Sequence, residues 1–163
     1  MTPLARLVAR WLPACGAEAA DGLPRPALLD MGQIARPTSP NSALFAPADV
    51  RPAPDVVTPV YEVAAQRLYE AVLVIAAAQP RTFAAATCPA RRQAHFVARS
   101  AWFNFPDLIT AQVDERGPAA STLTLYSRSV YGYSDLGANR RRLDAWLSAL
   151  PTILMQPTED DRR

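Results

Sequence analysis

The residues with the greatest capacity for chemistry lie close together in the last third of the chain. They offer guanidinium, phenol, hydroxyl, carboxylate and amide groups: Arg128, Tyr131, Tyr133, Ser134, Asp135, Asn139 and Arg140. Arginine binds carboxylates and phosphates through paired hydrogen bonds, and the free N–H groups at the start of a helix favour anions. The sequence therefore predicts that the 131–140 loop, with Arg128, recognises an anionic small molecule, a lipid head group or a carboxylate of a protein partner.

Three consecutive arginines, 140–142, fall where the first turn of a helix is expected. Cations at this end oppose the helix dipole by roughly 0.3–1 kcal/mol each. Either the nearby carboxylates of Asp135 and Asp144 compensate them, or an external anion does. Arginines around a helix more commonly point to solvent or pair with local acids, and that outcome would remove the anion site.

Two other interpretations of the loop remain open. Ser134, Asp135 and His95 are the only elements of a nucleophilic triad, and the serine does not stand in a Gly-x-Ser-x-Gly turn. A hydrolase using Ser134 or Asp135 is therefore an alternative, and an enzyme is less expected than a binding module. In a purely structural role, Ser134, Asp135 and Asn139 would only fasten a strand to the following helix.

Composition argues against several classes of function. The single histidine, His95, and the two cysteines, Cys15 and Cys88, form no metal-ligand spacing, and Gly132 and Gly137 match no nucleotide-binding pattern. We therefore expect neither a metal nor a cofactor. The formal net charge is only +2, which argues against a nucleic-acid-binding protein with a clustered basic face.

The elements that must position these residues are predicted from periodicity. Residues 121–130 alternate as in a half-buried strand, with Leu123, Leu125, Ser127 and Ser129 inward and Thr122, Thr124, Tyr126, Arg128 and Val130 outward. After the loop, Asn139 is expected as the N-cap of a helix that stops at Pro151. An earlier amphipathic helix is expected over 60–78, capped by Thr58 or the preceding turn.

Further strands are expected at 81–87, 92–103 and 107–114. Four consecutive strands joined by short turns favour an α+β fold: a four-stranded antiparallel meander with two main helices packed on one face. The outer face would carry Tyr126 and Arg128, with His95 and Arg99 beside them. Aromatic residues near this sheet are expected mostly in the core or at its rim, although they could line a pocket: Trp102, Tyr126, Tyr131 and Tyr133.

The ends of the chain are expected to differ from this domain. Eight of the sixteen prolines lie between residues 23 and 59, so this stretch should wrap the surface as extended or turning chain. The expected organisation is an amphipathic segment and linker at 1–35, a single α+β domain at 36–150 and a flexible tail at 151–163.

Residues 1–13 show the pattern of a short amphipathic helix with Arg6 and Arg10 on its polar side. We expect a helix packed on the domain or a frayed terminus, and weak peripheral contact with a membrane is the alternative. No stretch approaches the roughly 20 apolar residues of a membrane span. The expected location is therefore the cytoplasm, or alternatively the periphery of the inner membrane.

Three stretches of the chain form a recognisable signature. The longest is Ser-Arg-Ser-Val-Tyr-Gly-Tyr-Ser-Asp-Leu-Gly-Ala-Asn-Arg-Arg-Arg-Leu at 127–143, and the others are Arg-Pro-Thr-Ser-Pro-Asn at 36–41 and the segments at 99–100 and 105–109. Together they resemble a known bacterial family, the "domain of unknown function 1499". The resemblance covers about Arg36 to Leu150. Many relatives read Ser-Arg-Val-Gly before the Tyr-Ser-Asp, where this chain has Val130 and Tyr131. If that arginine has a role in relatives, the resemblance implies that Arg128 takes it here or that it is absent. The family implies an architecture more than a function.

Overall fold

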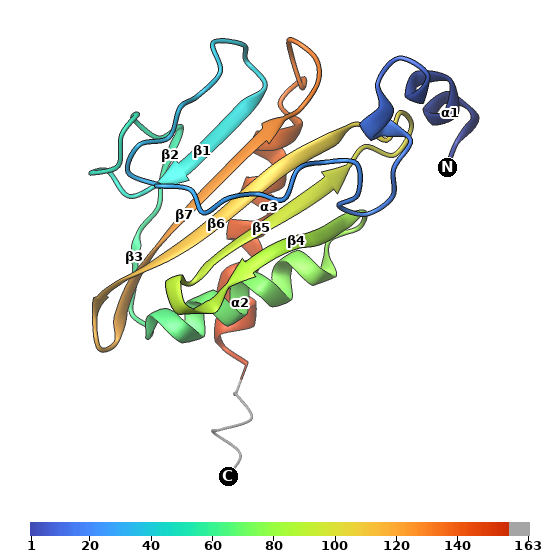
Figure 1. Cartoon of the computed structure of the whole chain (residues 1–163). Coiled ribbons are helices and arrows are strands. Elements are labelled where there is room, and N and C mark those ends of the chain that lie inside the picture. The colour runs from blue at the N-terminus through green and yellow to red at the C-terminus, as the bar shows by residue number, and fades with distance from the viewer. Residues whose placement is uncertain (157–163) are drawn as a thin grey trace.

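The computed structural model describes residues 1–156 and is built around one mixed sheet of seven strands (Figure 1). The strand order is β2-β1-β7-β6-β5-β4, and β3 also pairs with β7. The strands are β1 (Ser42–Ala46), β2 (Val56–Val57), β3 (Val60–Tyr61), β4 (Thr82–Cys88), β5 (Gln93–Arg99), β6 (Pro106–Gly117) and β7 (Ala120–Ser129). The fold is therefore α+β, as the sequence predicted.

The expected four-stranded meander is only part of this sheet. Strands β4 to β7 do form an antiparallel meander, but β1 pairs antiparallel with β7 and β2 pairs parallel with β1. Pro40 and Pro47 bracket β1, whose five residues are enough for a short strand. Pairing with β1 also satisfies backbone groups that would otherwise make β7 an exposed sheet edge.

Helices α2 (Ala65–Ala78) and α3 (Ala138–Leu154) cover one face of the sheet (Figure 1). The inward residues of β7 meet them as predicted, because Leu123 and Leu125 are fully buried in the main core. The rings of Phe96 and Trp146 meet edge to face at 5.5 Å between centroids. Among residues 1–156, no helix has the length and hydrophobicity needed to cross a membrane.

The predicted start of the first long helix was wrong. Val60 and Tyr61 form β3, and α2 begins only at Ala65. Thr58 does not cap the helix, because its hydroxyl donates to the Leu123 carbonyl at 2.8 Å. The pairing of β3 with β7 therefore takes precedence over helical periodicity for these residues.

Both predicted ends of the last helix also need correction. The first residue of α3 is Ala138, preceded by Gly137 with a φ of 77°, so Asn139 lies inside the first turn. Pro151 lies within the helix, which continues to Leu154. The Arg67 guanidinium donates to the carbonyls of Ile153 and Leu154, at 3.3 and 3.4 Å, and so caps this extended end. The predicted flexible tail falls mainly in residues 157–163, which lie outside the described residues.

The N-terminal part begins with α1 (Pro3–Ala9) and the short 3-10 helix η1 (Pro13–Cys15). Residues 16–37, here called the strap, then run without helix or strand across the sheet face opposite α2 and α3 (Figure 1). Figure 1 shows this medium-blue segment passing over β5, β6 and β7 towards β1. The outer face of the sheet is therefore covered by part of the proline-rich stretch that the sequence predicted to wrap the surface, although the sequence did not indicate which surface it would cover.

Candidate functional site

Three buried side chains hold the strap and the η1 turn before it, two from β5 and one from the loop between β5 and β6. Arg99 donates to the carbonyls of Ala14, Ala19 and Asp21 at 2.7–2.8 Å. Gln93 exchanges two hydrogen bonds of 2.9 Å with the backbone of Leu29. Asn104 donates to the carbonyls of Cys15 and Ala17 at 2.7 and 2.9 Å. The strap is thus fixed near residues 14–21 and 29, whereas residues 22–28 form no hydrogen bond within the described chain.

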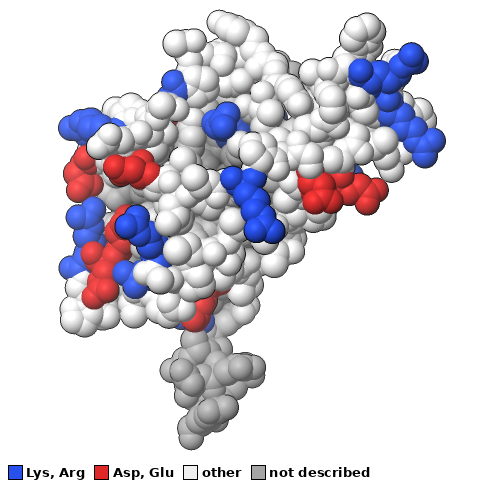
Figure 2. Space-filling view, in the orientation of Figure 1, with Lys and Arg blue, Asp and Glu red and all other residues white. Residues whose placement is uncertain are grey.

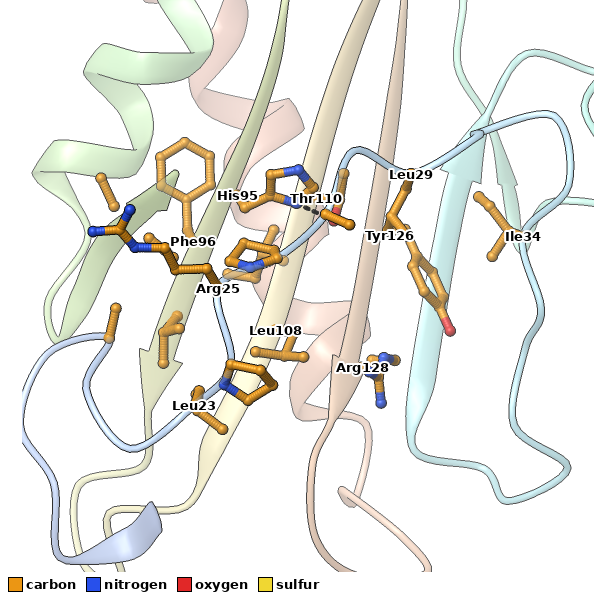
Figure 3. Close-up of a pocket in the computed structure, with 18 of the residues that line it drawn as sticks. Leu23, Arg25, Leu29, Ile34, His95, Phe96, Leu108, Thr110, Tyr126 and Arg128 are labelled. Carbon is orange, nitrogen blue, oxygen red and sulfur yellow. Dashed lines mark hydrogen bonds between the residues drawn. The ribbon is translucent and has the colours of Figure 1, made fainter. Parts of the chain in front are cut away.

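A cavity of about 1210 Å³ lies between the strap and the outer face of the sheet (Figure 3). Its floor comes from β5, β6 and β7, and its roof from residues 19–37. Apolar side chains dominate the walls, among them Leu23, Leu29, Ile34, Val97 and Leu108. This composition suits a ligand with substantial apolar surface.

The floor carries a polar row that crosses three strands. His95 on β5 pairs in register with Thr110 on β6, which in turn pairs with Tyr126 on β7. Each of the three is only 4% exposed. The His95 Nδ1 atom lies 3.0 Å from the Thr110 hydroxyl, which fixes the ring against the sheet (Figure 3).

Two atoms of this row have no hydrogen-bond partner among the described residues: His95 Nε2 and the Tyr126 hydroxyl. Both side chains line the cavity. Two further buried atoms without a partner, Arg92 Nε and Trp146 Nε1, belong to residues outside it. Buried polar atoms are nearly always paired in folded proteins, so two unpaired atoms in side chains that line one cavity make this cavity a candidate binding site.

Burial keeps both groups uncharged near neutral pH. It lowers the pKa of His95, so the imidazole is neutral. It also raises the pKa of Tyr126, and this outweighs the opposing effects of Arg128, Arg36 and Ser42. Ser42 is near the phenol, but no hydrogen bond of normal length and angle joins the two residues. The phenol is thus a free hydrogen-bond donor, and the free imidazole nitrogen donates or accepts according to the tautomer.

Charged residues of both signs line this cavity: the arginines Arg25, Arg36 and Arg128, and the acidic residues Asp21 and Asp30. Arg128 lines it and is exposed, and it forms no ion pair within residues 1–156. Arg36 also lines it but is paired with Asp55 at 2.8 Å. Arg128 is thus the predicted binding residue that the structure places at a cavity.

The structure does not gather the other predicted loop residues with Arg128. Asn139 is fully buried on the opposite side of the sheet, where it contacts Ser127 and Ser129. Asp135 accepts from the Gly137 and Asn139 backbone N–H groups at 2.9 and 2.7 Å, and from the Asn139 amide at 2.7 Å. These contacts fasten β7 to the start of α3.

An ion pair lies at the buried end of the contacts that join β7 to α3. Arg142 donates to Asp107 at 2.7 Å and to the Asn139 side-chain oxygen at 2.8 Å. Ser129 donates to the other Asp107 oxygen at 2.6 Å. The Asn139 amide also donates to the Asn41 carbonyl at 3.0 Å, which ties in the segment before β1. Each polar group of this cluster therefore has a protein partner.

The remaining arginines of the run also have protein partners. Arg140 lies 3.8 Å from Asp144 and stands 5.8 Å from the centre of the Phe45 ring. Arg141 donates to the Leu136 carbonyl at 2.7 Å. The charge that opposes the helix dipole is thus compensated locally.

The other loop residues do not form a catalytic arrangement. Tyr133 is 77% exposed, Ser134 is exposed and Tyr131 is half-buried. The Ser134 hydroxyl accepts from the Leu136 N–H at 3.2 Å. His95 faces the cavity, whereas Asp135 is bonded to Asn139 on the helix side, so the structure does not bring the three candidate triad residues together. Within residues 1–156, no cluster of three or more His, Cys, Asp or Glu side chains could hold a metal ion.

Sequence reasoning placed His95 and Tyr126 on the outer face, and considered His95 for a triad and Tyr126 for a pocket, but it did not bring the two together in one site. The signal that could have found them is the character of β5, where Gln93, His95 and Arg99 share a face with Val97.

Comparison with known proteins identifies a family but no activity. The sequence pattern of the family described as "Protein of unknown function (DUF1499)" matches residues 34–150. No curated protein matches the chain.

Three solved structures are distantly similar. A solution NMR structure from Thermobifida fusca has a TM-score of 0.45 at 9% identity, covering 69% of this chain and 89% of that one. The crystal structure of the di-domain ARO/CYC BexL from the BE-7585A biosynthetic pathway has a TM-score of 0.43 at 14% identity, covering 69% and 44%. A crystal structure from Thermus thermophilus has a TM-score of 0.40 at 8% identity, covering 70% and 97%. Likeness at this level supports no argument about function.

Proposed function

The chain belongs to the DUF1499 family of proteins of unknown function, and we propose that it is a non-catalytic binding module. Its ligand would be a largely apolar small molecule with an anionic group, held in the cavity between the strap and the sheet. The proposal keeps the anionic ligand that the sequence suggested and Arg128 as one of its contacts. It moves the site from the 131–140 loop to the other face of the sheet.

The observation that carries the proposal is the pair of buried orphan atoms, His95 Nε2 and the Tyr126 hydroxyl. A buried polar group without a partner costs roughly 1–3 kcal/mol. A protein without use for these groups would be more stable with apolar side chains in their place. A ligand atom that accepts from the Tyr126 hydroxyl and pairs with the imidazole would remove the cost on binding.

The surroundings of these atoms restrict the ligand class. Pockets for small molecules usually measure about 300–1,000 Å³, so a cavity of about 1210 Å³ has room for a molecule of that size. The apolar walls disfavour a fully hydrated anion such as free phosphate, because it would lose its hydration without replacement. A fatty-acid-like carboxylate satisfies both regions, with its chain among the apolar walls and its charge near Arg128.

A displacement titration with dodecanoate against bound anilinonaphthalene sulfonate tests this function. We expect Arg128→Gln to weaken dodecanoate binding about tenfold, since a hydrogen bond to a charged group contributes roughly 1.5–3 kcal/mol and exposure reduces it. Dodecanol, which lacks the charge, should bind the wild type and this variant alike.

Arg140→Gln is the matched control, because Arg140 is an exposed arginine in the first turn of α3, on the opposite side of the sheet. It should bind dodecanoate like the wild type. If Arg140→Gln lost dodecanoate binding and Arg128→Gln kept it, the binding site would be the loop and the cavity would be refuted.

A further inference from the structure

A second surface, independent of the cavity, exposes large apolar side chains around α1. We call it the aromatic patch: Met1, Leu4, Leu7, Trp11, Trp102 and Phe103, which are exposed by 56, 43, 57, 84, 69 and 41% respectively. Its two parts adjoin, since the Thr2 hydroxyl at the start of α1 donates to the Trp102 carbonyl at 2.5 Å. A group of large apolar side chains gathered at the surface in this way commonly marks an interaction site.

The apolar stripe of α1 is not the side that packs on the domain. Leu4 and Leu7 recur at the spacing of one helical face, whereas Ala5 is the buried residue of the helix, and Trp11 follows just after the helix ends at Ala9. The sequence predicted a helix packed on the domain, and in the structure only the small side chain of Ala5 is buried. The large apolar side chains remain available to a partner.

Charge beside the stripe is positive. Arg6 and Arg10 are four residues apart and both exposed, so they share a helical side that adjoins the apolar stripe. Residues 1–17 contain no acidic residue, and Glu18 and Asp21 are the first acids of the chain. Figure 2 shows basic side chains at the α1 corner of the molecule, at the upper right, with acidic atoms below them.

We propose that the aromatic patch docks α1 on the surface of a bilayer that contains anionic lipids. Tryptophan favours the boundary between lipid and water, and two of the three tryptophans of the chain, Trp11 and Trp102, are exposed here. Arg6 and Arg10 would lie at the level of the anionic head groups, with the leucines below them. With seven residues, α1 lies in the interface and does not span it.

Co-sedimentation of the full chain with phosphatidylcholine vesicles, with and without phosphatidylglycerol, tests the proposal. We expect binding to the mixed vesicles and at least tenfold weaker binding to phosphatidylcholine alone. Arg6→Gln and Arg10→Gln should each weaken binding to the mixed vesicles about fivefold, the effect of about 1 kcal/mol per basic residue. Trp11→Ser should weaken it at least tenfold.

Leu136→Ser is the matched control, because Leu136 is as exposed as Trp11, at 84%, but lies in the loop before α3. It should bind vesicles like the wild type. Equal binding of the wild type and Trp11→Ser, or no binding to mixed vesicles, would overturn the proposal. A dimer that Trp11→Ser dissociates would also overturn it, by assigning the patch to a second copy of the chain.

Discussion

Tyr126 combines two environments in one side chain. Its ring packs with Met31 and Ile34 of the strap and with Leu44 of β1, while its hydroxyl has no partner among the described residues. The ring contributes apolar burial, whereas the hydroxyl contributes only a desolvation cost in the free protein. Stability and ligand binding should therefore respond in opposite directions when the hydroxyl is removed.

Tyr126→Phe should raise the free energy of unfolding by about 1 kcal/mol and weaken dodecanoate binding about fivefold. Urea unfolding and the displacement titration measure the two effects. Tyr133→Phe is the control, because Tyr133 is 77% exposed and should change neither quantity. A loss of stability in Tyr126→Phe would mean that the hydroxyl has an ordinary protein partner.

His95 gives the chain a pH dependence of known sign. Burial lowers its pKa in the folded state, so the unfolded chain binds the proton first as the pH falls. Stability due to the neutral imidazole is complete above the unfolded pKa of about 6.5 and declines as the pH falls from there towards the lowered folded value.

We therefore expect the free energy of unfolding to decrease between about pH 7 and about pH 5.5, where carboxylates are still ionised. His95→Gln should flatten this slope, because His95 is the only histidine. Urea unfolding curves at several pH values provide the measurement. Parallel slopes for the wild type and the variant would contradict a buried neutral imidazole.

At the scale of elements, the junction of β7 and α3 is a closed polar network. Asp135 satisfies N–H groups of the first helical turn, and Arg142 with Asp107 closes the buried end. Such contacts explain the polar residues of the loop without a ligand. They favour the structural interpretation of Asp135 and Asn139 that the sequence left open.

Asp135→Ala should lower the free energy of unfolding by about 1–2 kcal/mol, the usual effect of losing a helix cap. The adjacent Ser134→Ala should cost much less, because its hydroxyl is exposed and makes one contact of 3.2 Å. Thermal melting compares the two variants, and neither should alter dodecanoate binding. A binding loss in Asp135→Ala, at a temperature where it is folded, would give the loop a functional role.

The elements with clear periodicity could be predicted from sequence. Strand β7 and its inward residues followed from the alternation of Leu123 and Leu125, and the hairpin of β4 and β5 from the turn at 88–91. The short strand β1 could not, because prolines on both sides hide a five-residue pattern. The helical end at Pro151 was missed since capping by Arg67, distant in sequence, allows α3 to continue.

At the scale of the whole molecule, the strap converts an outer sheet face into the floor of a cavity. No local pattern in residues 16–37 specifies where the strap crosses the sheet. Its path depends on Arg99, Gln93 and Asn104, which bind its backbone and not its side chains. The register that aligns His95, Thr110 and Tyr126 is likewise a property of the assembled sheet. The cavity could therefore not be predicted from the sequence.

Two truncated chains distinguish the contribution of the strap to ligand binding from the contribution of β1 to folding. A chain that begins at residue 34 should keep a native-like circular dichroism spectrum, melt at lower temperature and lose dodecanoate binding, because it lacks most of the roof. A chain that begins at residue 56 should fail to fold, because it also lacks β1, whose Phe45 is fully buried beside β7. Undiminished binding by the chain that begins at residue 34 would show that the strap does not form the site.

The most direct test of ligand binding in the cavity uses the single imidazole. His95 gives one set of imidazole ¹⁵N resonances, so its Nε2 signal can be followed without ambiguity during a titration with dodecanoate. We predict a saturable shift of the Nε2 resonance in the wild type that is weakened in Arg128→Gln. An unchanged Nε2 resonance, with dodecanoate shown to bind the same sample, would contradict the cavity as the binding site.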